Sequence, residues 1–332
     1  MTVLEEDVQN IIKDFDMSKF NNKTVLVTGA TGLIGKLCVK SLLECDYKVK
    51  VIALVRNSDK AEKIFGLNSD LELLVQDIND KISTNSEADY IIHAASVTSS
   101  ADFVNKPVET IMTSIEGTKN VLEYAKNNGV KGMVYLSSLE VYGIPTSVEV
   151  KENDYGFMDI LNPRSSYSEG KRIVETLCVS YASEFGIPVK IARLAQTFGA
   201  GVDKNDNRVF AQFAKSVINK ENIILHTKGE TARNYCYTTD AIRGIFTILT
   251  EGEIAQAYNV ANKNTYITVA DMAKTLENTY TKVVFDIDGK NRGFNPTMKI
   301  FLNTDKLEAL GWSAKIDLAQ MFERTIKSMQ EE

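Results

Sequence analysis

The sequence contains few residues of the kinds that bind metals or form disulfides, and it has no long hydrophobic run. Among its 332 residues are four cysteines without any Cys-x-x-Cys spacing and two histidines, His93 and His226, that lie far apart in the chain. We therefore expect reduced thiols and no metal site. No stretch approaches the roughly 18 consecutive apolar residues of a membrane-spanning helix. The N-terminus also lacks the basic and then apolar pattern of a signal peptide. These absences predict a cytoplasmic protein with no membrane partner.

Positive charge is scarce as well. The chain carries 38 lysines and arginines against 44 aspartates and glutamates, which gives a net charge of −6, and no basic face is visible in the sequence. Nucleic acid is therefore not an expected partner, because it binds proteins through clustered basic residues. Apolar residues at 44% and charged residues at 25% are ordinary for a soluble enzyme. The length favours one large domain with an additional lobe.

The most informative stretch is residues 23–35, where a β-branched apolar run leads into three glycines and then into an amphipathic pattern. This order predicts a strand, a tight turn and a helix. Gly29 permits the sharp turn, Gly32 leaves room for a pyrophosphate, and Gly35 lets the helix pack on the strand. An ordinary strand-to-helix turn would look similar in isolation. Here the turn opens a long series of alternating strands and helices, which favours a dinucleotide site.

Strand-like and helix-like segments alternate through the first 197 residues. Helices of this length provide the crossover connections that parallel strands require, so the alternation predicts an α/β fold with a doubly wound parallel sheet of the Rossmann type. The predicted strands are 24–27, 49–55, 71–76, 90–94, 132–136 and 187–194. The predicted helices are 2–20, the segment after the glycine turn to about residue 45, 108–127, 167–184, 209–219 and 240–249.

We divide the chain into an N-terminal helix (1–22), a dinucleotide-binding domain (23–197) and a mainly substrate-binding lobe (198–332). Segments near 229–260 are expected to return to the main domain, with 257–260 joining its sheet. The lobe is expected to close over the carboxyl ends of the strands, where open α/β sheets bind their ligands.

Tyr167 and Lys171 suggest the chemistry. Four residues apart on a helix, they share one face. A tyrosine that acts as acid or base at neutral pH must lose about three units from its usual pKa, or roughly 4 kcal/mol, and a neighbouring ammonium supplies part of this. If Tyr167 and Lys171 were the only signal, two ordinary surface side chains on a helix would be the simpler interpretation. Ser137 and Ser138, however, end a strand at the edge that also carries the glycine turn, and a serine hydroxyl there could hold a substrate oxygen.

These pieces belong to an ordered set of motifs. The set comprises TGATGLIG from Thr28, Asp77 with Ile78, HAAS from His93, GTKN from Gly117, SSLEVYG from Ser137, YSEGK from Tyr167, RLAQTFG from Arg193 and RNYCYTTD from Arg233. With it, the chain resembles the extended short-chain dehydrogenases/reductases, specifically the epimerase/dehydratase family that modifies sugar nucleotides. The resemblance covers nearly the whole chain and looks particularly like UDP-glucuronate decarboxylases and dTDP-glucose dehydratases.

The resemblance implies a nicotinamide dinucleotide along the first half of the chain and a nucleoside diphosphate sugar under the lobe. It implies Ser138, Tyr167 and Lys171 as the catalytic set, with Glu140 as a further acid or base. The expected cofactor-binding residues are Gly29, Thr31, Gly32, Leu33, Ile34, Gly35, Arg56, Asp77, Ile78, Ala94, Ala95 and Lys171. The expected substrate-binding residues are Ser96, Ser138, Gln196, Arg208, Arg233 and Lys299. Family members commonly pair through the helices at 108–127 and 167–184, so a homodimer is expected.

Several positions depart from the family pattern. Ser114 and Gln196 stand where asparagine is usual, and Lys299 stands where decarboxylases have arginine, with Arg292 as a candidate substitute. At the end of the second strand, where NAD-selective enzymes place an acid that binds the ribose, this chain has Val55 and then Arg56. A guanidinium suits a 2′-phosphate. A loop arginine stacked on adenine would also allow NAD, so NADP and NAD stay open, with NADP slightly favoured.

The reaction is open as well. Leu139 stands where dehydratases use an aspartate as general acid, although Glu140 beside it is kept, so full dehydration is less expected than epimerisation or decarboxylation. In the expected reaction, Tyr167 takes a proton while a hydride leaves the sugar C4 carbon for the nicotinamide. One alternative is an NADPH-dependent reductase of a nucleotide-linked keto sugar. Another, from a different class, is a non-catalytic regulator that senses a dinucleotide.

Overall fold

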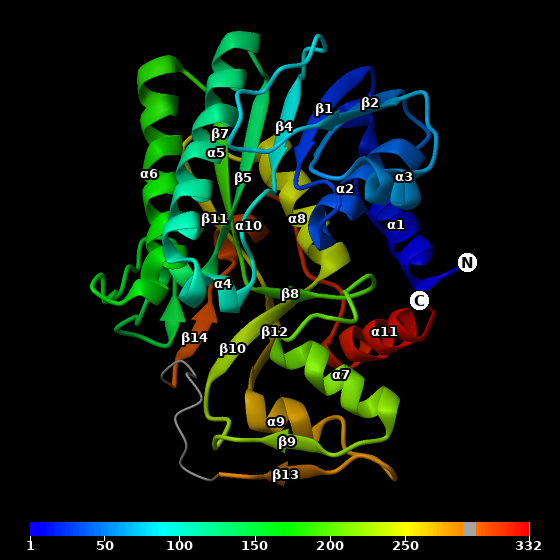
Figure 1. Cartoon of the computed structure of the whole chain (residues 1–332), viewed down its shortest axis with the longest axis vertical. Coiled ribbons are helices and arrows are strands. Elements are labelled where there is room, and N and C mark those ends of the chain that lie inside the picture. Colours follow the sequence, from blue (N-terminus) through cyan, green and yellow to red (C-terminus); the bar gives the residue numbers. More distant parts are fainter. Residues whose placement is uncertain (288–296, 332) are drawn as a thin grey trace.

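The computed structural model describes residues 1–287 and 297–331, and its centre is a sheet of seven parallel strands (Figure 1). The strands are β1 (Lys23–Thr28), β2 (Val49–Val55), β3 (Leu71–Val75), β4 (Tyr90–His93), β5 (Gly132–Ser138), β7 (Val189–Leu194) and β11 (Ala257–Val260). They lie in the order β11-β7-β5-β4-β1-β2-β3. After β3 the chain crosses to the other side of β1, so the carboxyl ends of β1 and β4 border the crevice in which such sheets bind ligands.

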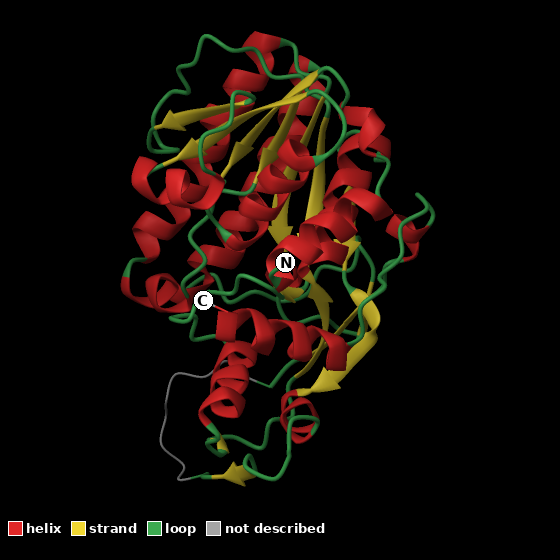
Figure 2. Ribbon diagram, turned by 90° about the vertical axis from the view of Figure 1, so that its right-hand side faces the viewer, coloured by secondary structure: helices red, strands yellow, loops and turns green. Residues whose placement is uncertain are grey.

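Helices cover both faces of this sheet (Figures 1 and 2). Strand side chains alternate between the faces, so Val25 and Val27 belong to one apolar cluster and Leu26 belongs to the other. The helices are α1 (Val3–Asp14), α2 (Leu33–Glu44), α3 (Ser58–Phe65) and α8 (Thr238–Glu251) on the first face, and α5 (Pro107–Asn128) and α6 (Ser166–Phe185) on the second. Within the two described ranges, no helix combines the length and the apolar character needed to cross a membrane.

The predicted α/β fold is confirmed, and each of the six predicted strands is present with ends that differ by a few residues. The predicted helix over 2–20 is wrong in its length. α1 ends at Asp14, because Phe15 adopts an extended conformation with φ −123° and ψ 142°. The Asp16 carboxylate then accepts the backbone N–H of Ser18 at 3.2 Å and begins a separate 3-10 helix, η1 (Met17–Phe20).

A smaller lobe packs below the carboxyl ends of the sheet (Figure 2). Its strands are β6 (Glu149–Val150), β8 (Gln196–Phe198), β10 (Ala232–Tyr237), β12 (Asn262–Thr268) and β14 (Lys299–Leu302), with β9 (Ile223–Leu225) and β13 (Val283–Phe285) as a separate pair. Its helices are α7 (Val209–Asn219), α9 (Val269–Lys274) and α11 (Leu318–Glu331), whereas α10 (Asp305–Glu308) packs against β11 of the main sheet. A third apolar cluster, which includes Phe198, Phe210 and Phe322, forms its core. Although it begins the chain, α1 contacts α11, so both ends of the chain lie together beside the lobe (Figure 1).

Candidate active site

A cavity of about 750 Å³ opens at the carboxyl ends of the central strands. It is bordered by the segments that follow β1, β4 and β5 and by β8 of the lobe. This volume is in the range of small-molecule and cofactor sites. The predicted site residues that line it are Gly29, Thr31, Gly32, Leu33, Ile34, Gly35, Arg56, Asp77, Ile78, Ala94, Ala95, Ser96, Ser138, Glu140, Tyr167, Lys171, Gln196 and Arg208. The fold therefore brings most of the predicted set into one cavity.

Two residues predicted to contact the substrate, Arg233 and Lys299, do not line the cavity, and their contact with the substrate stays a prediction. Arg233 on β10 and Lys299 on β14 belong to neighbouring parallel strands of the lobe, in which Ala232 pairs with Lys299 and Arg233 pairs with Ile300. The two residues therefore lie close together in the lobe sheet, where Arg233 is half-buried and the Lys299 side chain is exposed to solvent. Arg292, the candidate substitute for an arginine at position 299, lies outside the described residues.

The glycine turn between β1 and α2 has the geometry of an anion site. Gly29 has a φ of 65°, and a Cβ there would lie 2.8 Å from the backbone nitrogen of Ala95. A Cβ on Gly35 would lie 2.2 Å from the carbonyl oxygen of Gly29, so glycine allows α2 to pack closely on the turn that ends β1, and α2 also contacts β1 and β2. Gly32 is the N-cap of α2, and no side chain caps this helix end. Its N–H groups therefore face the cavity as donors that fit a dinucleotide pyrophosphate.

Two cations line the end of the cavity next to β2. Arg56 follows the strand directly, and Lys60 stands in the first turn of α3. The Asn57 side chain fixes this turn, since its carbonyl oxygen accepts the Lys60 backbone N–H at 2.8 Å. Both cationic side chains are exposed. Lys60 was not predicted, because α3 itself was not predicted.

Tyr167 lies in the first turn of α6 and is held from two sides. The Phe103 ring of α4 (Ser100–Asn105) stacks on the Tyr167 ring with centroids 4.2 Å apart and planes 13° apart. The Ser138 hydroxyl lies near the phenol and lowers its pKa. Burial raises the pKa of Tyr167 above its ordinary value, and the nearby Glu140 carboxylate raises it further, whereas the Ser138 hydroxyl acts in the opposite direction. The lowered phenol pKa that catalysis needs therefore stays a prediction for the protein with its cofactor bound.

Lys171 lies one turn further along α6 and is also buried. Its Nζ donates a hydrogen bond to the Leu136 carbonyl oxygen at 2.8 Å and lies 5.8 Å from the centre of the Tyr167 ring. Burial lowers the pKa of Lys171 to about 8, while the Glu175 carboxylate, one turn later on α6, raises it. The ammonium is thus still mostly protonated at neutral pH.

Glu175 belongs to a buried polar network directly behind the site. Its carboxylate accepts the Ser137 hydroxyl at 2.5 Å and Arg193 Nη2 at 2.6 Å. Arg193 is 1% exposed and also donates to the Tyr142 hydroxyl at 3.0 Å. A buried carboxylate of this kind needs its partners, because desolvation penalises an unpaired charge. The network anchors the end of β5 and the middle of α6, and so holds Ser138 and Lys171 in position.

The Glu140 carboxylate lines the cavity but is not free. Its Oε2 contacts Arg164 Nη1 at 3.4 Å and accepts the Ser168 hydroxyl at 3.1 Å. Both partners come from the segment that begins α6. Leu139 beside it is 3% exposed and belongs to the main apolar cluster. Leu139 therefore packs in the core, whereas Glu140 presents an acid to the cavity.

The opposite wall of the cavity carries Gln196 and Arg208. The side-chain oxygen of Gln196 is buried and has no hydrogen-bond partner among the described residues, so it is free to accept a donor from a ligand. Arg208 donates from Nε and Nη2 to the Asp206 carboxylate at 2.9 Å and 2.5 Å. These bonds hold the guanidinium in place and leave its Nη1 for an anion.

His93 stabilises the loop after β4. The Ala95 N–H donates to the Thr28 hydroxyl at 3.1 Å, which in turn lies 2.7 Å from His93 Nδ1, while His93 Nε2 lies 2.9 Å from the Thr118 hydroxyl. Burial lowers the pKa of His93 to about 3, so the ring is neutral. No group of three or more metal-ligating side chains occurs in the described part of the chain. His93 is therefore a structural residue.

Comparison with protein-family models identifies the family. Residues 25–261 match the model of the NAD dependent epimerase/dehydratase family. The chain belongs to this family. The matched segment includes the glycine turn, Ser138, Tyr167 and Lys171, while α1 and α11 lie outside it. The predicted family and its enzyme class are thereby confirmed.

The proteins similar to this epimerase/dehydratase chain are named for different activities. It is 30% identical to UDP-glucuronic acid decarboxylase 6 of Arabidopsis thaliana, over 91% of this chain and 88% of that protein. It is 27% identical to UDP-glucuronic acid decarboxylase 1 of Xenopus tropicalis, over 99% of this chain and 79% of that protein. The solved structure of a UDP-glucose 4-epimerase from Thermotoga maritima, with UDP-glucose, is similar at 25% identity and a TM-score of 0.81, over 93% of this chain and 99% of that chain.

Sequence reasoning missed three groups of residues at or behind the site of this family member. Lys60 and Phe103 stand on short helices whose periodicity is too brief to recognise. Glu175 had a usable signal, because it follows Lys171 by four residues on the same helix face. Arg193 was quoted as part of a motif, but its burial and its pairing with Glu175 depend on the fold.

Proposed function

We propose that this protein transiently oxidises the C4 carbon of the sugar in a nucleoside diphosphate sugar. The observation that carries the proposal is that Ser138, Tyr167 and Lys171 meet the glycine turn in one cavity. Tyr167 then moves a proton to and from the C4 hydroxyl, and Ser138 orients the same oxygen through its hydroxyl. Gln196 and Arg208 on the opposite wall contact the substrate, with Arg208 as the partner of the diphosphate.

The cofactor fits the donors that the chain supplies. The N–H groups at the start of α2 hold the pyrophosphate, and the Lys171 ammonium binds the nicotinamide ribose. An oxidised nicotinamide held there would supply a hydride acceptor for the C4 carbon and positive charge near the phenol. Positive charge at this point opposes the effect of burial and of Glu140, and so brings the Tyr167 pKa back toward the neutral range.

Epimerisation or decarboxylation is the outcome that the site supports best. A dehydratase must remove the C5 proton and also protonate the leaving C6 hydroxyl, but Leu139 is packed into the core, so the single Glu140 carboxylate would have to serve both steps. A second candidate is an NADPH-dependent reductase of a nucleotide-linked keto sugar. The two cations beside β2 favour it, because they suit a phosphorylated cofactor.

A panel of UDP-, dTDP-, CDP- and GDP-sugars, each incubated with the enzyme and either cofactor, tests the function. Mass spectrometry and chromatography are expected to reveal either an isomer of equal mass or, from a uronic acid, a product lighter by one carbon dioxide. A product heavier by two hydrogens from a keto sugar would instead favour the reductase. If no nucleotide sugar is converted under any of these conditions, the proposed function is wrong.

We also propose NADP as the preferred cofactor, with Arg56 and Lys60 as the partners of its 2′-phosphate. Replacing Arg56 with Ala is expected to weaken NADP binding about tenfold through loss of a charge-assisted hydrogen bond, and to leave NAD binding nearly unchanged. Lys63→Ala is a matched control, since this exposed cation is on the same helix as Lys60 but does not line the cavity. An unchanged NADP affinity in Arg56→Ala would contradict the assignment.

We also propose that the protein forms a homodimer through α5 and α6. These helices pack together along one side of the sheet (Figure 1) and leave Val108, Met112 and Ile173 exposed, with 73% of Val108 accessible. Covering such side chains in a helix bundle would remove apolar surface from water. Sedimentation at micromolar concentration is expected to report twice the chain mass, and a monomeric mass would rule this interface out.

A further inference from the structure

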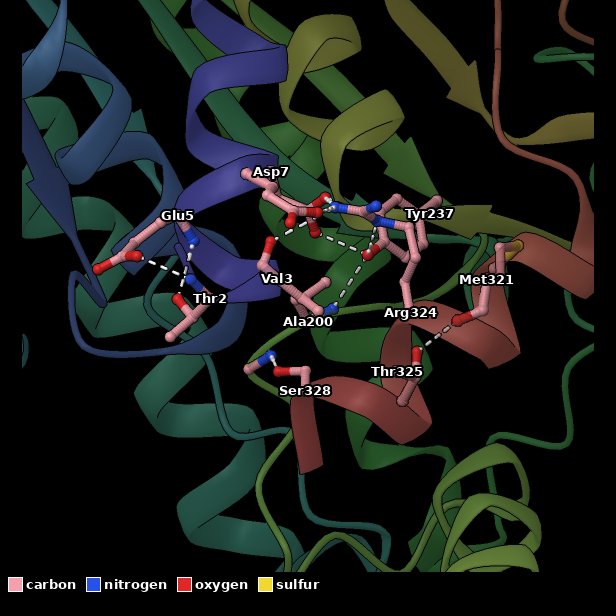
Figure 3. Close-up of polar contacts among 12 residues, drawn as sticks. Thr2, Val3, Glu5, Asp7, Ala200, Tyr237, Met321, Arg324, Thr325 and Ser328 are labelled. Carbon is pink, nitrogen blue, oxygen red and sulfur yellow. Dashed lines mark hydrogen bonds and ion pairs between the residues drawn. The ribbon is translucent and has the colours of Figure 1, made fainter. Parts of the chain in front are cut away.

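A buried polar cluster joins the two ends of the chain (Figure 3). Asp7 of α1 is fully buried, and its carboxylate accepts the Tyr237 hydroxyl at 2.6 Å and Arg324 Nη2 of α11 at 2.7 Å. Arg324 Nε also donates to the Tyr237 hydroxyl at 3.2 Å. Tyr237 is the last residue of β10, so the cluster ties α1 and α11 to the lobe sheet. None of these three residues lines the catalytic cavity.

The cluster holds a loop that leads to the cavity. The loop, residues 199–208, connects β8 to α7. The Ala200 N–H donates to the Tyr237 hydroxyl at 3.4 Å, and the Gly201 N–H donates to the Ser328 hydroxyl of α11 at 3.0 Å. The Gly201 carbonyl oxygen accepts Lys36 Nζ of α2 at 2.8 Å. The start of the loop is therefore fixed by two side chains, Tyr237 at the end of β10 and Ser328 on α11.

The other end of the same loop carries the anion-binding arginine. Arg208 lines the cavity, and Asp206 of the loop holds its guanidinium. Lys215 of α7 fixes this end by donating to the Asp206 carbonyl oxygen at 2.9 Å. The position of the Arg208 guanidinium thus depends on two anchors, of which the first is the cluster between the chain ends.

We propose that Tyr237, Ser328 and the Asp7–Arg324 pair are positioning residues for binding of the substrate's nucleoside diphosphate, acting through the 199–208 loop on Arg208. The inference rests on the proposed function, which makes Arg208 the diphosphate partner. Asp7 of α1 and Arg324 and Ser328 of α11 lie outside the segment that matches the family model, whereas Tyr237 lies inside it. The inference assigns the chain ends a role in substrate affinity in addition to folding.

Two buried hydroxyls on α11 provide a matched test. Ser328 bonds the loop, whereas Thr325, one turn earlier, donates only to Met321 of its own helix at 2.7 Å (Figure 3). Calorimetry on the full chain first determines which of UDP, CDP, dTDP and GDP binds most tightly. Ser328→Ala is then expected to weaken that diphosphate about fivefold, because the Gly201 N–H loses its acceptor. Thr325→Val is expected to stay within twofold of wild type, since it removes no bond to the loop.

Tyr237→Phe is expected to behave like Ser328→Ala, because it removes only the hydroxyl that joins Asp7, Arg324 and Ala200. Hydrogen exchange at the amides of 199–208 is expected to accelerate in both variants and not in Thr325→Val. Binding of the dinucleotide cofactor is expected to be unchanged in all three. Diphosphate affinity that is equal in Ser328→Ala and Thr325→Val overturns the positioning role and leaves the proposed function standing. Failure of wild type to bind any of the four diphosphates overturns both.

Discussion

Replacing Tyr167 with Phe is expected to lower turnover by about three orders of magnitude, the usual scale for loss of a general acid or base. The ring still stacks on Phe103 in this variant, because the stacking does not involve the hydroxyl. Fold and cofactor binding are therefore expected to be retained. Only the oxygen that exchanges a proton with the substrate is removed.

A second tyrosine on the same helix provides the control. Tyr181 donates its hydroxyl to Glu123 at 2.5 Å on the far part of α6 and does not line the cavity. Steady-state turnover of a nucleotide sugar found in the panel, measured for both variants, separates proton transfer from loss of any tyrosine hydroxyl. Near wild-type turnover by Tyr167→Phe, or an equal loss in Tyr181→Phe, would refute the catalytic assignment.

Glu140→Gln is expected to produce the second largest loss, about a hundredfold in turnover, because a neutral amide no longer exchanges protons and no longer pairs with Arg164. Gln has nearly the same shape, and its oxygen still accepts the Ser168 hydroxyl. Glu169→Gln is the control, since this acid on α6 pairs with Arg172 at 3.2 Å and does not line the cavity. Equal turnover in Glu140→Gln and wild type would remove Glu140 from the mechanism.

Leu139→Ala separates packing from chemistry at the same site. Truncating this buried side chain is expected to lower the free energy of unfolding by about 2–5 kcal/mol. Turnover measured well below the unfolding temperature is expected to fall less than in Glu140→Gln. We also expect no release of water from dTDP-glucose or UDP-N-acetylglucosamine. A product lighter by one water would show that the chain performs dehydration without an acid at position 139.

Local patterns were sufficient to predict the glycine turn and the strand ends that border the cavity. The φ of 65° at Gly29 and the close contacts around Gly35 follow from short-range backbone geometry, so a glycine triplet after an apolar strand indicates them directly. Strand ends are equally predictable, because parallel strands place their carboxyl ends at one edge. This is why Ser138 and the residues after β4 were predicted at the cavity.

The tertiary structure alone determined the electrostatics and the walls of the site. The sequence places Lys171 near Tyr167 and suggests a lowered phenol pKa, but burial beneath Phe103 and proximity to Glu140 raise it. Strand pairing in the lobe places Arg233 and Lys299 close together, and neither lines the cavity. Such outcomes depend on desolvation and on contacts between distant segments.

The cluster between the chain ends shows most clearly that contacts between distant segments cannot be predicted from local sequence patterns. Asp7 and Arg324 are separated by 317 positions, and neither belongs to a recognisable motif. In the sequence each reads as an ordinary charge on the solvated face of an amphipathic helix. Packing of α1 against α11 and β10 buries Asp7 and half-buries Arg324. A helix periodicity specifies which face is apolar, whereas the partner that covers a buried charge is chosen by the assembled fold.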